Sequence, residues 1–242
     1  MPLLIDGVET FNKFFLNALS LVIPFVPVIV FLAMFSLTAT ADLNALLALA
    51  KILLGLAVGT VLVFLIGAAT VAVTGHISPI PYLKKAVGFA PIPFSINGSN
   101  ALLPFVMKFA EEKLGVKQSL VSFLIPVGMQ FNKTRQCFFF AMSAAMMLKV
   151  FQIELDEDTL LTFLVSVFIM ALSKPPIPCG GIVCLNYMFG VLGIPVEAVA
   201  VIFAIEPIAT VFVSIMNATA NFTATFCVAK MDNGVDEKTY FA

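Results

Sequence analysis

The chain has 242 residues, of which 61% are hydrophobic and 11% are charged. A soluble domain carries about 25% charged residues, so this composition excludes an ordinary soluble protein and indicates an all-α polytopic membrane protein. The formal net charge is −1, and no basic surface of the kind that binds nucleic acid is indicated.

Charge-free stretches predict three ordinary transmembrane helices, within residues 14–41, 52–75 and 207–229. Each stretch is as long as the roughly 20 apolar residues that cross a bilayer. The preceding segment, 1–13, is mixed polar and lacks the basic region of a signal peptide. We therefore expect it to lead into an array of helices that is already embedded in the membrane.

Two other apolar stretches, 86–107 and 175–196, contain proline and glycine at high density. A continuous lipid-facing helix cannot hold them, because the freed backbone groups would have no partner in the hydrocarbon. Each stretch therefore predicts a re-entrant helical hairpin, hairpin one over about 79–114 and hairpin two over about 159–195.

Each hairpin is followed by a polar span, the broken helix 118–150 after hairpin one and the last helix 198–230 after hairpin two. This order is typical of an inverted-repeat secondary transporter, whose site lies where broken elements meet. Lysines flank hairpin one on both sides, so the positive-inside tendency predicts that it opens to the cytoplasm. The same rule places the N-terminus and the tail 231–242 in the cytoplasm.

The last helix carries a polar stripe, defined here as Glu206, Thr210, Ser214, Asn217 and Asn221. Spacings of four, four, three and four residues place these side chains on one helical face. Such a stripe inside a bilayer either bonds to another helix or lines a path for a polar solute. Five polar positions favour the solute path.

Short motifs occur at four of these places in order. They are Gly98-Ser99-Asn100-Ala101-Leu102-Leu103-Pro104, then Pro126-Val127-Gly128 with Asn132, then Pro176-Ile177-Pro178-Cys179-Gly180-Gly181, and finally Asn217-Ala218-Thr219-Ala220-Asn221 with Val228-Ala229-Lys230. Together they resemble the dicarboxylate/amino acid:cation (sodium) symporter family, the glutamate-transporter homologues, over roughly residues 15–230.

The resemblance implies the C-terminal part of the glutamate-transporter elevator fold, in a homotrimer. Residues 14–47 would be a scaffold-type transmembrane helix and 48–230 the mobile transport domain, with hairpin two as its outer gate. Sodium would couple uptake of amino acids or dicarboxylates. The family's first four helices have no counterpart in this sequence, so we expect a fragment, one half of a split transporter, or a protein that works differently.

The resemblance also implies two sets of site residues. The substrate-binding positions are Ser99, Asn100, Thr134, Arg135, Pro178, Gly180, Thr210, Ser214 and Asn217. The sodium positions are Gly128, Asn132, Asn217 and Asn221. The family's sodium-binding carboxylates fall on Thr134 and Asn221, its amine-binding Asp on Thr210 and its acid-binding Arg on Val213. Because a hard cation prefers anionic oxygen, we expect weakened or altered sodium coupling.

Positive charge enters the broken helix at Lys133 and Arg135, the chain's single arginine. Charge in a membrane segment is expensive and usually functional. Arg135 could bind an anionic group of the substrate, pair with Glu206 as a structural lock, or reach into an aqueous cavity without a specific role. The pair Glu206-Pro207 predicts a kink at the entry of the last helix, and a proton-coupling carboxylate is the alternative.

No nucleophile–base pair or phosphate loop can be placed on facing elements, so we expect no enzyme and no cofactor beyond a possible coupling Na+. The predicted function is symport of a small organic anion or amino acid across the plasma membrane. The alternative is a non-transporting or truncated membrane subunit that needs a separate N-terminal partner.

Overall fold

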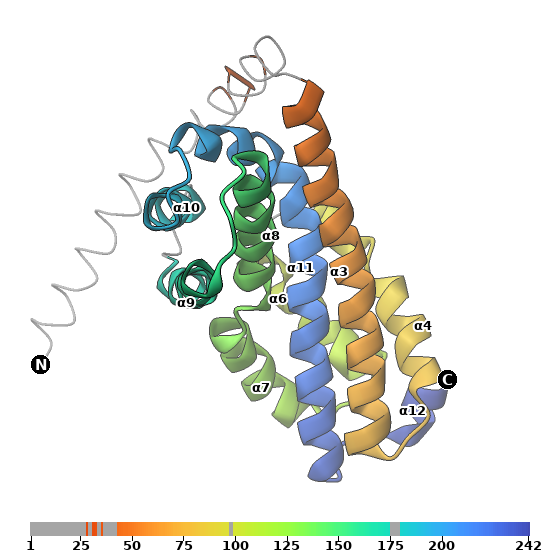
Figure 1. Ribbon diagram of the computed structural model, residues 1–242. Helices are drawn as coiled ribbons and strands as arrows, with labels where there is room; N and C mark the ends of the chain where they lie inside the picture. The colour runs from red at the N-terminus through yellow and green to blue at the C-terminus, as the bar shows by residue number, and fades with distance from the viewer. Residues whose placement is uncertain (1–27, 29–30, 33–34, 36–42, 97–98, 175–179) are drawn as a thin grey trace, which may run out of the picture. The chain divides into compact units, whose positions relative to one another are not determined.

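The computed structural model describes residues 28, 31–32, 35, 43–96, 99–174 and 180–242. Within these residues the regular elements are helices (Figure 1). One isolated β-bridge pairs Val116 with Val235. The helices are α3 (Leu43–Gly75), α4 (Pro79–Phe89), α5 (Ile92–Ser95), α6 (Ser99–Glu112), α7 (Gln118–Phe131), α8 (Thr134–Val150), α9 (Glu157–Ser173), α10 (Gly180–Val191), α11 (Glu197–Met231) and α12 (Glu237–Phe241).

The contacts of the chain divide it into two compact units. One unit contains α9, α10 and the first turns of α11, and its α9 packs against α10. The other contains most of α3, then α4 to most of α8, the rest of α11, and α12. The predicted first transmembrane helix, 14–41, lies almost entirely outside the described residues.

Two described helices, Leu49–Gly75 and Glu197–Met231, are long and apolar enough to cross a membrane. Large apolar side chains face outward along α3, with Leu54 65% and Val73 71% exposed. Such exposure is unfavourable in water and expected against lipid tails. Helix α11 runs from Glu197 to Met231, so Pro207 lies inside it, and the kink predicted at Glu206-Pro207 stays a prediction.

Breaks separate the helices where the sequence has proline or polar residues. Pro91 lies between α4 and α5, and Pro93 is the second residue of α5. Asn132-Lys133 separates α7 from α8. The helices α4 to α6 fall within the range predicted for hairpin one, and α9 and α10 fall close to the range predicted for hairpin two. The re-entrant path and the inverted repeat stay predictions.

Aromatic rings form the centre of the larger unit. Phe222 of α11 lies 4.7 Å from Phe109, 5.6 Å from Phe89 and 6.0 Å from Tyr82, measured between ring centroids. Tilted ring pairs at these distances stabilise a core beyond the area that they bury. Tyr82 and Phe222 are fully buried. The rings therefore tie α4 and α6 to α11.

Three glycines of α3 accept side chains from neighbouring helices. A Cβ on Gly55 would lie 2.1 Å from Met142 Cε, and one on Gly59 would lie 2.8 Å from Phe138. A Cβ on Gly67 would lie 2.5 Å from the hydroxyl of Tyr82. Helix α3 therefore packs closely against α8 and α4 because these three positions have no side chain.

Residues 232–242, which we call the C-terminal strap, are tied to the loop between α6 and α7. The Lys117 amide donates to the Gly234 carbonyl at 2.9 Å, and the Asp236 amide donates to the Gly115 carbonyl at 2.8 Å. Gly115 has φ +73°, a left-handed conformation in which a Cβ would also meet the Asp236 carbonyl oxygen at 2.5 Å. This turn therefore requires glycine.

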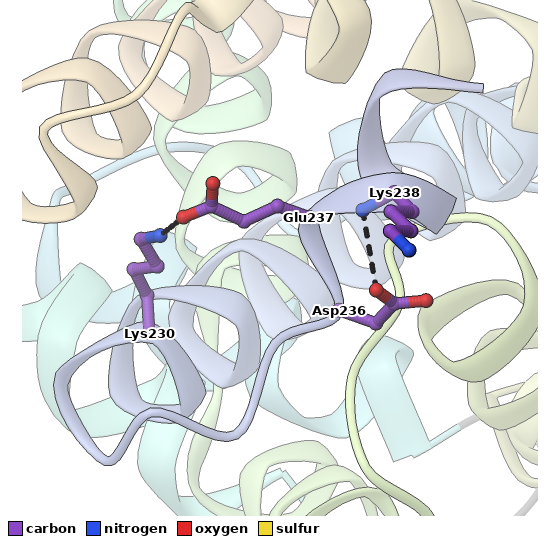
Figure 2. A network of polar contacts seen from close by, with 4 residues as sticks. All are labelled: Lys230, Asp236, Glu237 and Lys238. Atoms are coloured by element: carbon purple, nitrogen blue, oxygen red, sulfur yellow. Dashed lines mark hydrogen bonds and ion pairs between the residues drawn. The ribbon is translucent and has the colours of Figure 1, made fainter.

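Local contacts order the strap itself (Figure 2). Lys230 of α11 forms an ion pair with Glu237, and the Asp236 carboxylate caps α12 by accepting from the Lys238 amide at 3.2 Å. The Thr239 hydroxyl donates to the same carboxylate and holds the pKa of Asp236 below its ordinary value.

Lys85 of α4 fixes the strap from the other side. Its ammonium group donates to the carbonyls of Lys113, Thr239 and Tyr240, each at 2.8 Å. Three donors thus meet three acceptors at the C-terminal ends of α6 and α12, where the helix dipoles favour a cation. The Tyr240 hydroxyl donates to the Ser78 carbonyl at 2.7 Å. These hydrogen bonds therefore tie the strap to α4 and to the C-terminal end of α6.

Candidate functional site

The polar stripe of α11 faces the protein interior. Thr210, Ser214, Asn217 and Asn221 are each 9% exposed or less, and Glu206 is half-buried. A buried polar row in a membrane helix needs partners, because each polar group left alone in a low-dielectric interior is destabilising. The partners of the stripe therefore indicate what this part of the molecule is built to hold.

Asn132, at the break between α7 and α8, contacts the middle of the stripe. Its side-chain amide donates to the Asn217 carbonyl at 3.0 Å, and its side-chain oxygen accepts from the Thr134 amide at 3.0 Å. The second bond is a local turn that Asn commonly forms, and it orients the start of α8. One side chain thus fixes Lys133 and the first turn of α8 beside Asn217.

Asn221 makes the next contact along the stripe. Its amide donates to the Ile125 carbonyl of α7 at 3.0 Å. A Cβ on Gly128 would lie 2.1 Å from the side-chain oxygen of Asn221, so only glycine lets the two helices approach this closely. The four predicted sodium positions therefore meet at one α7–α11 contact. The oxygens already engaged at this contact are the backbone carbonyls of Asn217 and Ile125, which accept from the two amides, and Oδ1 of Asn132, which accepts from the Thr134 amide.

Several buried oxygens around the break have no hydrogen-bond partner among the described residues. They are Oε1 of Gln136, Oγ of Ser143, Oγ of Ser214, Oδ1 of Asn217 and Oγ1 of Thr219. Ser214 and Asn217 share the stripe, and Gln136 lies one helical turn beyond Asn132, which is bonded to Asn217. A buried unpaired oxygen costs about 1–3 kcal/mol, so such a group marks the place of a solute, an ion or water.

Charged groups lie beside these oxygens. Arg135 and Lys133 at the start of α8 are half-buried, and the negative charge of Glu206 acts on the Arg135 guanidinium. Both residues belong to the same unit. A lock with Glu206, a substrate-binding role for Arg135 and a position without a specific role therefore all stay predictions.

Thr134 takes a different place from the other site residues. It lines a cavity of about 330 Å³ between α3, α8 and α11, together with Gly67, Thr70 and Thr223. The Thr223 hydroxyl donates to the Thr219 carbonyl at 2.6 Å and accepts from the buried hydroxyl of Tyr82. This second polar row, Thr219 and Thr223, was not predicted from the sequence, although the four-residue step between the two threonines was a signal for it.

The hairpin residues are described only in part. Ser99 and Asn100 lie at the start of α6, where the structure describes their backbone alone, and Pro178 lies outside the described residues. Gly180 is buried at the start of α10, in the other unit. Five of the predicted substrate positions thus share the larger unit, namely Thr134, Arg135, Thr210, Ser214 and Asn217. Within the described residues no three His, Cys, Asp or Glu side chains gather as a metal site would require.

Known proteins resemble this chain over most of its length. It is 24% identical over 227 residues to the L-cystine uptake protein TcyP of Bacillus cereus, a match that covers 93% of this chain and 49% of that protein. It is 26% identical over 153 residues to the proton/sodium-glutamate symport protein of Bacillus subtilis, covering 63% of this chain and 35% of that protein. The neutral amino acid transporter B(0) of Rattus norvegicus is 27% identical over 129 residues, which cover 53% of this chain and 23% of that transporter.

The chain therefore spans about half the length of the curated relatives that it matches over nearly its whole extent. The profile of the sodium:dicarboxylate symporter family matches residues 2–231. This agrees with the motifs quoted above and with the helical membrane architecture. The relatives are transport proteins and not enzymes. The chain belongs to the sodium:dicarboxylate symporter family.

Proposed function

We propose that this chain carries the transport site of a symporter for a small amino acid or organic anion in the plasma membrane. The observation that carries the proposal is the group of buried oxygens of Gln136, Ser214 and Asn217, which have no hydrogen-bond partner among the described residues and share one unit with Arg135 and Glu206. A zwitterionic amino acid offers N–H donors to the oxygens and a carboxylate to the guanidinium. The relatives that take up cystine, glutamate or neutral amino acids suggest these as first substrates.

The coupling ion is the second part of the proposal. Asn221 and Asn132 donate amide hydrogens to backbone carbonyls at the α7–α11 contact, and neutral amides hold sodium more weakly than carboxylates do. We propose that sodium coupling is weak here and that Glu206 takes part in proton coupling. We also propose that the protein works as a homotrimer with elevator-type movement and that both of its termini lie in the cytoplasm. These features are proposed from membership of the family.

Uptake into proteoliposomes tests the proposal. Radiolabelled cystine, glutamate, alanine and succinate would be offered with a sodium gradient, with a proton gradient and with neither. We expect one amino acid to accumulate, little dependence on sodium, and a loss of at least tenfold in Arg135→Ala. If Glu206→Gln leaves the pH dependence of uptake unchanged, the coupling role is wrong. A double-mutant cycle on Arg135 and Glu206 in a stability assay separates the lock, which predicts strong coupling, from the substrate-binding role.

A second candidate function is that of a membrane subunit that needs a separate partner chain. It is suggested by the match to TcyP of Bacillus cereus, which covers only 49% of that protein. A subunit that needs a partner carrying the remaining helices would fail to accumulate any substrate alone. Coexpression with the polypeptide encoded immediately upstream would then restore uptake and bring both chains through one purification step. Absence of uptake in both preparations would reject transport altogether.

A further inference from the structure

A crevice of about 540 Å³ opens between α4, α6 and the C-terminal strap, away from the candidate transport site. Its walls include the apolar side chains of Phe89, Ile92 and Phe109 and the polar side chains of Lys85, Lys113, Glu112 and Thr239. Gly88 lies in its α4 wall, and a Cβ there would meet no atom within 4 Å. The crevice thus has an apolar part and a charged rim.

Two lysines and one glutamate form the charged rim of the crevice. Lys85 is held in place by its three carbonyl acceptors, and the charge of Lys113 is close enough to repel it. Among the described residues the ion pairs are Lys108–Glu112 and Lys230–Glu237, so neither Lys85 nor Lys113 has a carboxylate partner there. Glu112 is already engaged by Lys108 at 3.8 Å. An anion beside Lys113 would therefore relieve the repulsion between the two ammonium groups.

The surroundings of the crevice are apolar. On α4 the side chains of Ile80 and Val87 are 62% and 52% exposed, and Phe94 of α5 is 65% exposed. Where this face meets a bilayer, these side chains would lie against hydrocarbon, and an amphipathic ligand could enter the crevice without leaving lipid. Basic crevices between helices near a membrane surface are places where anionic head groups bind.

We propose that this crevice binds an anionic phospholipid. Lys113 contacts the phosphate, the fixed charge of Lys85 supports it, and one acyl chain lies along Phe89 and Ile92 in the space that Gly88 leaves open. Because the strap forms part of the wall through Thr239, the bound lipid also stabilises the base of α4 and α6. The proposal does not depend on which solute is transported.

Lipid binding to the purified full chain tests the proposal. Phosphatidylglycerol or phosphatidylcholine is titrated in detergent and counted by native mass spectrometry, and sn-glycerol 3-phosphate is added as a soluble phosphate without acyl chains. Melting is followed with a thiol-reactive dye, which suits a chain with four cysteines and no tryptophan. We expect one phosphatidylglycerol to bind several-fold more tightly than phosphatidylcholine and to raise the melting temperature, while glycerol phosphate has no effect.

Two pairs of variants locate the site. Lys113→Gln and Lys84→Gln remove the same charge near the same end of the helices, but Lys84 does not line the crevice. Gly88→Leu fills the crevice, whereas Gly190→Leu places the same side chain at another position with open space around it. Since one lysine near an anionic lipid contributes about 1 kcal/mol, Lys113→Gln should weaken phosphatidylglycerol binding about fivefold.

The outcomes are decisive in either direction. Loss of the phosphatidylglycerol preference in Lys113→Gln and Gly88→Leu, with both controls unchanged, supports the proposal. Equal losses in Lys113→Gln and Lys84→Gln would mean attraction by general surface charge and would overturn it. Competition by glycerol phosphate would assign the crevice to a soluble anion and overturn it as well. Should Gly88→Leu fail to fold, the lysine pair alone gives the same decision.

Discussion

Two regions of the larger unit treat their polar groups in opposite ways. At the strap, donors and acceptors meet, with the three hydrogens of the Lys85 ammonium on three carbonyls. At the break between α7 and α8, buried oxygens of Gln136, Ser214 and Asn217 have no partner among the described residues. The first arrangement stabilises the fold and the second gives up stability. The difference agrees with a structural role for the strap and with the ligand site that we propose at the break.

The largest expected effect lies at the strap. Lys85→Met removes three charge-assisted hydrogen bonds, and we expect the free energy of unfolding to fall by about 3 kcal/mol. Amide hydrogen exchange over residues 236–242 should accelerate in the same variant. Lys84→Met is the matched control, because Lys84 is exposed on the next position of α4 and should change stability by less than about 0.5 kcal/mol. Equal effects in both variants would show that Lys85 acts only through helix α4.

An intermediate effect is expected next to the break, at Gly128 in the α7–α11 contact. A Cβ there would lie 2.1 Å from the Asn221 side-chain oxygen, so Gly128→Ala should destabilise by about 2 kcal/mol despite the higher helix propensity of alanine. Gly88→Ala, with open space around the new methyl group, should be neutral or slightly stabilising. Thermal melting in detergent measures both.

The same contact offers a rescue. Because the clash is with Asn221, the double variant Gly128→Ala with Asn221→Ala should be more stable than the two separate losses would predict. Strict additivity would mean that Gly128 is needed for another reason, and the interpretation of the α7–α11 contact would have to change.

The smallest effect on stability is expected at Ser214. The buried hydroxyl of Ser214 has no partner within the described part of the chain, so Ser214→Ala should leave stability unchanged or raise it by up to about 1 kcal/mol while uptake falls several-fold. Thr223→Val removes a hydroxyl that is bonded to both Tyr82 and the Thr219 carbonyl, and should lower stability by about 1 kcal/mol. Melting and uptake would be measured on both. Destabilisation by Ser214→Ala would assign that hydroxyl to packing.

The sequence predicted the features that depend on local pattern. Periodicity placed the polar stripe on one face of α11. The motif that ends in Asn132 included the residue that contacts the stripe at Asn217. The amide directions of Asn132 and Asn221 were not predictable, because they depend on which carbonyls the facing helices present. The bond from Lys85 to Tyr240 joins residues far apart in the sequence and leaves no local signal either.

The glycines of α3 determine how this helix can move. Displacing α3 by one helical turn, about 5.4 Å, would bring Val63 either to the Gly67 position opposite Tyr82 or to the Gly59 position opposite Phe138. Valine has a side chain where each contact leaves no room even for a Cβ. A slide by one turn in either direction would therefore require Tyr82 or Phe138 to move aside. The close fit at these glycines favours movement of α3 together with α4 and α8 over sliding of α3 past them.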